Sequence, residues 1–363
     1  MTKQEMVYSK LCLIASRSLR SGVTRLPSEA ELCLMFGVSR QTLRSALRRL
    51  REEGVLTSLQ GSGYYLTGTI PGGDNHIVLL IPDDEAYIYP SLTSDISRYF
   101  SSRSFRVSVV LTGDDVNTER AALKSLLESP PRGIIVQCIH SSIPTPNDDL
   151  YRQLENRGTA LIFIESRYPN LNSGVIAGGG SAEAGFIMTR HFLDMGHTAI
   201  AWLGVEDDMT GYERCLGYCR ALLAAGLRID SRLIRRIPSS LVYSTKDGDP
   251  PKYLYDLLSA LPHEVTGIIC QNDKAAYMVI TALEDMGFQV PSSVSIAGFD
   301  NSYLTRAGRI RLTTIGYSGA TLAAQICSAM TDLLTGKAKE SAAPVSWKLI
   351  KGGTAMRVGD VFY

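Results

Sequence analysis

The first regular pattern of apolar residues in the chain predicts a short helix around residue 30. Ser28 is a favoured N-cap residue, and Glu31, three positions later, can complete a capping box. The helix turns Leu32 and Phe36 inward. It is expected to end at Gly37, because the turn that follows needs a left-handed backbone conformation.

A second helix is expected directly after this turn, with Ser39 as its N-cap. Its apolar positions recur at three- and four-residue spacing: Leu43, Ala46, Leu47 and Leu50. When this stripe packs on the first helix, four polar side chains face solvent: Arg40, Gln41, Arg44 and Arg48. Two short helices with cations on the second are typical of a helix-turn-helix, whose second helix lies in the major groove of DNA. A packing module with a solvated basic face is the alternative.

Beyond residue 54 the pattern changes to period two and predicts a hairpin with glycines at its tip. The motif LPSE…L…FGVSR.T.R.AL..L, followed by this hairpin, resembles the GntR-type winged helix over residues 8–67. Many members carry Arg where this chain has Ala30, so that base contact is not expected here. The resemblance implies that the motif contacts DNA through Ser28, Glu29, Ser39, Arg40, Gln41, Thr42, Arg44 and Arg48, with Gln60 and Gly61 in the wing.

From residue 76 onward, short apolar runs alternate with amphipathic segments, which predicts α/β structure with parallel sheets and right-handed crossovers. The expected strands are 76–81, 106–111, 133–136, 160–165, 198–203, 267–270 and 293–299. The expected helices are 92–100, 119–128, 150–158, 182–195, 213–225, 253–260 and 274–286. Residues 76–363 are too many for one such sheet, so we expect two lobes with a cleft between them. The predicted organisation is a DNA-binding domain at 1–68, a linker at 69–75 and a two-lobed domain at 76–363.

Composition adds a charge asymmetry between these parts. Residues 1–68 hold ten Lys and Arg against five Asp and Glu, a net charge of +5, and the rest of the chain carries −4. A basic head on a mildly acidic body suits a head that binds a polyanion. Seven scattered cysteines indicate free thiols in a reducing compartment, so we expect a cytoplasmic protein without a structural metal or cofactor. No stretch approaches membrane-spanning length.

Polar side chains follow the ends of several predicted strands. In open α/β sheets ligands bind beyond these ends, so the residues that follow them are candidate ligand contacts. The candidates are Tyr87, Tyr89, Gln137, His140, Glu165, Arg167, Arg214, Asn272 and Asp300. Rings, carboxylates, an amide and a guanidinium suit a polyhydroxylated ligand, whose hydroxyls both donate and accept hydrogen bonds. Some could instead cap the next helix, as Asp273 is expected to do, whereas Arg214 at an expected helix start opposes the helix dipole.

The body resembles the LacI/GalR regulator domain in the stretches HFLDMGHTAIAWLG, ERCLGYCRALLAAGL and GIICQNDKAAYMVITALEDMGFQVPSSVSIAGFDN. The resemblance implies ligand contacts at Glu165, Arg214, Asn272, Asp300 and Tyr317. A GntR-type head on such a body, with YIYPSLTSDISRYF and TPNDDLYRQLENRG, resembles the arabinose repressors. That implies a homodimer that binds double-stranded operator DNA and releases it when L-arabinose fills the cleft.

Three alternatives remain open at this point. The regulator could respond to another sugar, a sugar phosphate or a nucleoside. The chain could be a sugar-binding protein with a vestigial head. It could also be an enzyme, although the sequence shows no nucleophile–base constellation and no P-loop.

Overall fold

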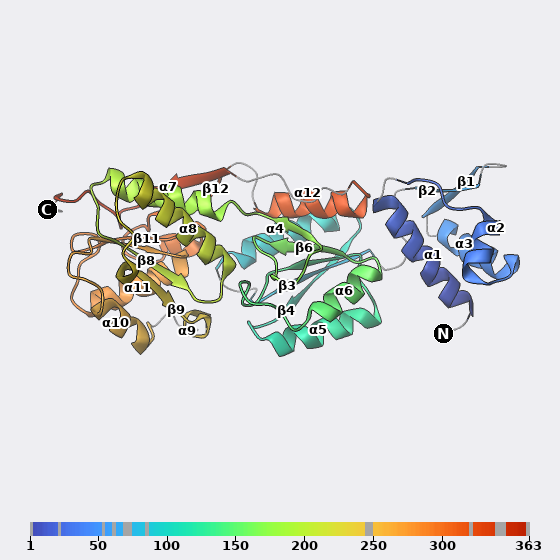
Figure 1. The fold of residues 1–363 in the computed structure, drawn as a ribbon, viewed down its shortest axis with the longest axis horizontal. Coiled ribbons are helices and arrows are strands. Elements are labelled where there is room, and N and C mark those ends of the chain that lie inside the picture. The colour runs from blue at the N-terminus through green and yellow to red at the C-terminus, as the bar shows by residue number, and fades with distance from the viewer. Residues whose placement is uncertain are drawn as a thin grey trace.

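The structure is a computed structural model. It describes residues 3–20, 23–52, 55–59, 63–67, 75–83, 87–243, 250–318, 322–337 and 346–360. Three units follow one another along the long axis of the molecule: a small N-terminal head and two α/β lobes (Figure 1). Within the described residues, no helix is both long enough and apolar enough to cross a membrane.

The head contains three helices and a two-stranded hairpin. They are α1 (Lys3–Arg20), α2 (Glu29–Phe36), α3 (Arg40–Glu52), β1 (Leu56–Leu59) and β2 (Gly63–Leu66). The capping box of Ser28 and Glu31 is present, and Gly37 has the expected left-handed conformation with a φ of 64°. The stripe of Leu43 and Leu47 is fully buried. These local predictions are therefore confirmed, whereas α1, which packs on α3, was not predicted.

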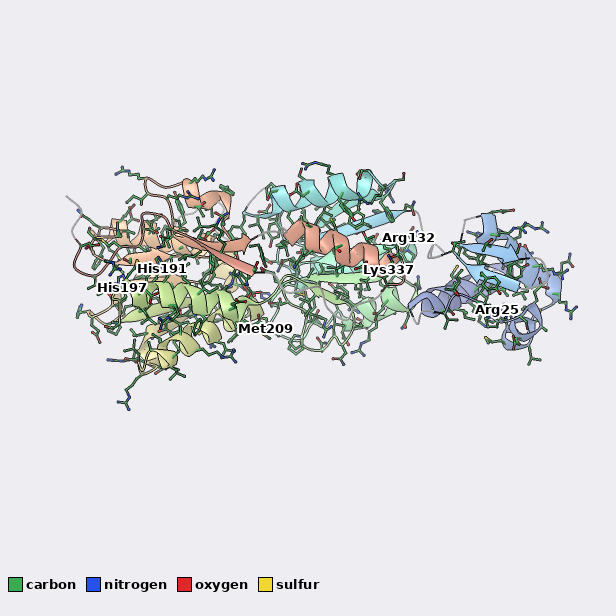
Figure 2. The ribbon with its side chains drawn as sticks, turned by 90° about the horizontal axis from the view of Figure 1, so that it is seen from above. Arg25, Arg132, His191, His197, Met209 and Lys337 are labelled. Carbon is green, nitrogen blue, oxygen red and sulfur yellow. The ribbon has the colours of Figure 1, made fainter. Side chains whose placement is uncertain are left out.

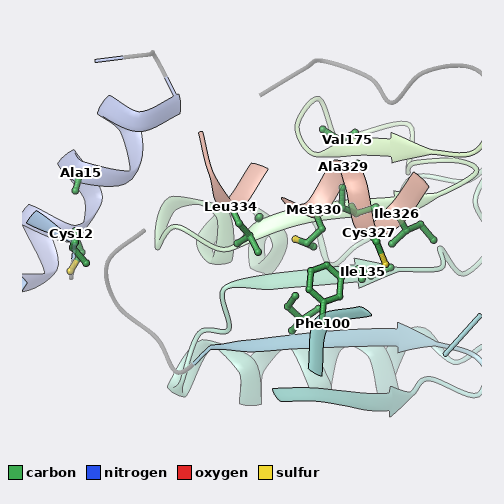
Figure 3. Packing of buried hydrophobic residues seen from close by; sticks show 14 of the residues in the cluster. Cys12, Ala15, Phe100, Ile135, Val175, Ile326, Cys327, Ala329, Met330 and Leu334 are labelled. Atoms are coloured by element: carbon green, nitrogen blue, oxygen red, sulfur yellow. The ribbon is translucent and has the colours of Figure 1, made fainter. Parts of the chain in front are cut away.

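The lobe next to the head, here called the N-lobe, is a parallel five-stranded sheet in the order β4-β3-β5-β6-β7. Its strands are β3 (His76–Ile81), β4 (Arg106–Leu111), β5 (Gly133–Val136), β6 (Ala160–Ile164) and β7 (Val175–Ala177). Its helices are α4 (Tyr89–Ser101), α5 (Val116–Glu128), α6 (Asp148–Asn156) and α12 (Leu322–Leu334). Alternate strand residues pack on α4 and α12 on one face and on α5 and α6 on the other. Figure 3 shows Met330 and Cys327 of α12 against Ile135 and Phe100 in this core.

The second lobe, the C-lobe, has a parallel sheet in the order β11-β10-β8-β9. Its strands are β8 (Ile200–Val205), β9 (Ile234–Ile237), β10 (Gly267–Cys270) and β11 (Ser295–Ala297). The helices are α7 (Ser181–Asp194), α8 (Met209–Ala224), α9 (Ser239–Tyr243), α10 (Lys252–Ser259) and α11 (Asp273–Asp285), with the short 3-10 turns η1 (Ser231–Leu233) and η2 (Tyr303–Arg306). Helices α7 and α8 cover one face of the sheet, and α10 and α11 cover the other.

An antiparallel pair, β12 (Thr314–Ser318) and β13 (Ser346–Ile350), lies beside the C-lobe core. The chain leaves β12 for α12 of the N-lobe and returns to β13, so the lobes are linked by more than one passage of the chain. The predicted class, a winged helix joined to a two-lobed α/β body, is confirmed. The linker predicted at 69–75 lies outside the described residues except for Asn75.

Candidate functional site

The exposed face of α3 carries the predicted DNA contacts. Arg40, Gln41, Arg44 and Arg48 are all exposed, while the opposite side of the helix is buried. Ser39 Oγ accepts a hydrogen bond from the Thr42 backbone N–H at 3.3 Å, so these two residues fix the start of α3. Gln60 and Gly61 of the wing lie outside the described residues.

Glu29 joins the three parts of this face. Its carboxylate accepts from Arg44 Nε at 2.9 Å and from the Tyr64 hydroxyl at 3.2 Å, which connects α2, α3 and β2. Burial and the Glu29 charge raise the pKa of Tyr64. Arg44 itself is 62% exposed, so the ion pair contributes at most about 1 kcal/mol to stability. Its main effect is to orient the Arg44 side chain. Ser28, beside it, is engaged in the capping box.

Arg214 is the centre of the contacts between the two lobes. Its side chain is 2% exposed, and Nη2 donates to Asp300 Oδ1 at 2.6 Å. The same nitrogen lies 3.8 Å from Oε1 of Glu165, which follows β6 of the N-lobe. Nη1 donates to the Gln271 carbonyl oxygen at 2.6 Å. A buried guanidinium thus pairs with carboxylates from both lobes.

Helix packing sets the position of Arg214. Helix α8 begins at Met209, with Asp208 as N-cap, and crosses α7 closely: a Cβ on Gly185 would lie 2.0 Å from the Arg214 carbonyl oxygen. Figure 2 places Met209 on the side of the C-lobe that is turned to the N-lobe. The predicted helix start near 213 is wrong by four residues. Arg214 therefore lies in the second turn, and its carboxylate partners, not the helix dipole, explain its place.

Two tyrosines complete this network. The Tyr87 hydroxyl of the N-lobe donates to Asp300 Oδ2 of the C-lobe, and the Tyr317 hydroxyl donates to Glu165 Oε1. Burial, Asp300 and Asp273 raise the pKa of Tyr87, and burial and Glu165 raise that of Tyr317, so both stay protonated donors at neutral pH. Of the two tyrosines considered for the cleft, Tyr87 contacts Asp300, whereas Tyr89 packs against the N-lobe core.

Strained backbone marks the same places. Tyr87, His140, Glu165 and Asp300 have φ values of 64°, 48°, 60° and 92°. Residues other than glycine rarely adopt such φ angles, which cost of the order of 1–3 kcal/mol each and cluster at ligand sites. Each of these residues follows a strand and turns its side chain toward the other lobe.

A second set of contacts lies at the lobe interface beside the first. His140 Nδ1 lies 2.5 Å from Asp207 Oδ2, and Ser141 Oγ donates to Asp208 Oδ1 at 3.0 Å. The Gln271 side-chain amide donates to Asp208 Oδ2, and its oxygen accepts from the Val205 N–H at 2.6 Å. His140 thus lies at the lobe interface and pairs with Asp207.

Other candidates lie elsewhere. Arg167 donates to the Ser173 and Gly174 carbonyl oxygens and so holds a loop of the N-lobe. Asn272 accepts from the Ala275 N–H at 2.8 Å and caps α11. The cap predicted for Asp273 is therefore wrong; its carboxylate instead accepts from Ser302 N–H and Thr314 Oγ1. Gln137 follows β5, half-buried, with its backbone N–H donating to Leu80 O.

The prediction missed Trp347 of β13. Its ring stacks on Tyr317 at a centroid distance of 4.3 Å and lies 5.8 Å from Arg214 Cζ. Tyr317 and Trp347 are direct partners in the β12–β13 ladder.

Two hollows lie away from this network: one of about 880 Å³ between α11 and η2, and one of about 330 Å³ between α7 and β13. Neither hollow is lined by a residue of the Arg214 network.

Burial makes Glu165 sensitive to pH. Desolvation raises its pKa from 4.5 to about 7 against the opposing attraction of Arg214. Between pH 4.5 and 7 the folded carboxyl keeps a proton that the unfolded chain has lost, so the free energy of unfolding falls as pH rises through this window. We expect a decrease of about 1–3 kcal/mol in wild type, measured by urea unfolding at pH 5 and pH 7.5.

The matched variant is Glu165→Gln, which keeps shape and hydrogen bonding but does not titrate. It should show a smaller decrease, with the remainder from Asp273, whose pKa burial also raises to about 7. Identical pH dependence in the two proteins would contradict the assignment.

Comparisons with known proteins show the family of the chain. The family model for bacterial regulatory proteins of the gntR family matches residues 3–66, and the one for the periplasmic binding protein-like domain matches residues 189–355. The arabinose metabolism transcriptional repressor of Halalkalibacterium halodurans is 30% identical over 300 residues, covering 80% of this chain and 78% of that protein. The chain belongs to this family of transcriptional repressors.

A second member, the arabinose metabolism transcriptional repressor of Geobacillus stearothermophilus, is 25% identical over 345 residues and covers 93% of this chain and 88% of that protein. Among solved structures, the transcriptional regulator CelR in complex with cellobiose has a TM-score of 0.65 at 19% identity, covering 88% of this chain and 92% of that one. The similarity to CelR shows the fold of this chain. Its family membership shows that this chain is a DNA-binding transcriptional regulator.

Proposed function

We propose that this protein is a cytoplasmic homodimeric repressor whose binding to operator DNA is controlled by a small sugar in the interlobe cleft, with L-arabinose as the effector. The observation that carries the proposal is the combination of two sites on one chain. Helix α3 exposes five arginines and a glutamine, and a buried arginine pairs with carboxylates from both lobes. The names of the two similar repressors point to arabinose as the sugar.

On the DNA side, α3 enters the major groove. Arg40 and Arg44 contact guanine edges or phosphates, Gln41 contacts a base edge, and Arg48 neutralises the backbone. Ser39 and Thr42 set the start of the helix, and Gln60 and Gly61 hold the wing against the phosphates. A dimer places two such helices in successive major grooves, so the operator is pseudo-palindromic.

On the effector side, the sugar binds where the lobes already touch. Tyr87, Glu165, Arg214 and Asp300 contact its hydroxyls, with Tyr317 behind Glu165. Because these residues come from both lobes, a bound sugar changes the relation between the lobes and, through residues 69–75, the spacing of the two heads. The sugar can shift the equilibrium between the DNA-binding and the released state only by the difference in its affinity for the two states.

Replacing Arg44 by alanine tests the recognition helix. We expect operator affinity to fall about 5- to 150-fold, because a good base or phosphate contact contributes about 1–3 kcal/mol. The measurement is fluorescence anisotropy at fixed salt, with an operator fragment selected by the wild-type protein from random-sequence DNA.

The control is Arg232→Ala, which removes the same charge from an exposed arginine paired with Asp230 at 2.7 Å in the C-lobe. It should leave operator affinity unchanged. Wild-type affinity in Arg44→Ala would refute the recognition-helix assignment, and equal losses in the two variants would reduce it to a net-charge effect.

A further inference from the structure

One turn of the N-lobe, residues 140–143, contacts the start of α8 in the C-lobe through backbone as well as side-chain groups. The Ser142 N–H donates to the Asp207 carbonyl oxygen at 3.1 Å. In the other direction, the Met209 N–H donates to Ser141 Oγ at 2.8 Å. Met209 is the first residue of α8, the helix that carries the central arginine of the lobe interface. The position of this turn therefore decides whether the two lobes meet at α8.

The conformation of the 140–143 turn requires support from its surroundings. His140 has a φ of 48°, and a residue other than glycine keeps such an angle only when surrounding contacts fix it. Ile139, the residue before it, makes one such contact. Its side chain is 2% exposed, and its backbone N–H donates to the Tyr168 hydroxyl at 2.8 Å. This bond fixes the chain where it enters the turn.

A buried carboxylate sets the direction of the Tyr168 hydroxyl. Tyr168 is 2% exposed, and its hydroxyl donates to Glu119 Oε1 at 2.7 Å. Burial, Cys138 and Glu119 raise the pKa of Tyr168, so the hydroxyl keeps its proton. Because that one proton is used in the bond to Glu119, the oxygen presents a lone pair to the Ile139 N–H. The hydroxyl thus connects the carboxylate with the chain that enters the turn.

Glu119 is fully buried and receives two more hydrogen bonds. Asn147 Nδ2 donates to Oε2 at 2.7 Å, and the Tyr151 hydroxyl donates to Oε1 at 2.7 Å. Burying a carboxylate is costly unless its oxygens are hydrogen-bonded, and three neutral donors supply these bonds here. Two buried tyrosines, Tyr151 and Tyr168, therefore share one carboxylate, and Tyr168 also bonds the chain before the turn.

We propose that Tyr168 is a positioning residue for the contact between the lobes. Together with Glu119 it fixes the 140–143 turn in the position in which the turn meets the start of α8. It acts through the Ile139 N–H and the turn. Because the contact at α8 breaks whenever the lobes separate there, Tyr168 sets how readily they separate, whichever ligand the cleft accepts.

The test is amide hydrogen exchange in the full-length protein without ligand, comparing Tyr168→Phe with Tyr151→Phe. Both substitutions remove one buried hydroxyl from Glu119 Oε1, and only the first also removes the acceptor of the Ile139 N–H. The readout is the exchange of the Met209 amide, which lies in the other lobe and bonds to the turn. Its rate reports how often this contact opens.

Met209 exchange should rise about 2- to 12-fold in Tyr168→Phe, the change expected for the loss of one hydrogen bond of about 0.5–1.5 kcal/mol. In Tyr151→Phe it should keep the wild-type rate. A rise of the same size in both variants would mean a general loosening of the N-lobe. Wild-type exchange in Tyr168→Phe would mean that other contacts hold the turn. Either result overturns the proposal.

A second variant covers the case in which Tyr168→Phe does not fold. A tyrosine fluorinated beside its hydroxyl, placed at position 168, keeps the bond to Glu119. Fluorine withdraws electrons from the oxygen and makes it a weaker acceptor for the Ile139 N–H. Met209 exchange should then rise by a smaller factor, whereas the same replacement at position 151 should leave it unchanged. Wild-type exchange with the fluorinated residue at position 168 overturns the role of Tyr168.

Discussion

Arg214→Ala is expected to destabilise the two-lobed body by about 3–5 kcal/mol and to abolish sugar binding. The substitution leaves Asp300 and Glu165 as buried carboxylates without their cation, and removing one partner of a buried ion pair has a cost of this size. It also removes the group that the ligand shares with both lobes. Urea unfolding and calorimetric titration with L-arabinose measure the two effects separately.

The control for Arg214 is Arg98→Ala. Arg98 is 75% exposed on α4 and pairs with Asp95 at 3.2 Å, so the loss should be about 0–1 kcal/mol, with unchanged sugar affinity. If Arg214→Ala matched the stability of Arg98→Ala and still bound sugar, Arg214 would not be the centre of the site. Arg214→Lys, which keeps a charge but cannot form the same forked pair, should recover stability only in part.

Leu47→Ala is expected to unfold the head while the body keeps its sugar affinity. Leu47 is fully buried in α3, and removing its side chain costs about 2–5 kcal/mol through lost burial and the cavity that remains. A domain of about 60 residues has little stability to lose. Operator binding, followed by anisotropy at 37 °C, should therefore disappear.

Leu34→Ala is the matched substitution on the surface of the head. Leu34 on α2 is 88% exposed, so its loss should change stability by less than about 0.5 kcal/mol and leave operator binding intact. Sugar binding measured on the same Leu47→Ala sample decides whether head and body respond separately. Loss of sugar affinity along with operator affinity would contradict that separation.

Local signals in the sequence are sufficient to predict helices α2 and α3 of the head. The capping box, the left-handed Gly37 and the stripe of Leu43 and Leu47 each depend on neighbours within four residues, so the sequence reports them directly. The same holds for strands that read as continuous apolar runs, such as His76–Ile81. Helix α1 was missed because its apolar residues form a less distinct stripe than those of α3.

The site could be predicted only in part. Glu165, His140 and Asp300 follow strand ends, and this rule brings them to the carboxyl-terminal edges of the two sheets. Trp347 could not be found in this way, because its place beside Arg214 depends on the pairing of β12 with β13, which the chain reaches only after passing through α12. Asn272 and Arg167 satisfy the same strand-end rule yet bond locally, since capping and loop contacts compete for the same residue types.

The measurement that tests the central claim most directly is the release of operator by sugar. Wild-type protein is bound to its selected, fluorescently labelled operator fragment at fixed salt, and L-arabinose is added while anisotropy is recorded. We predict that operator affinity falls at least fivefold at saturating sugar, a typical coupling of about 1 kcal/mol or more, and that Arg214→Ala shows no response. Sugar that saturates the cleft by calorimetry and yet leaves operator affinity unchanged would contradict the claim.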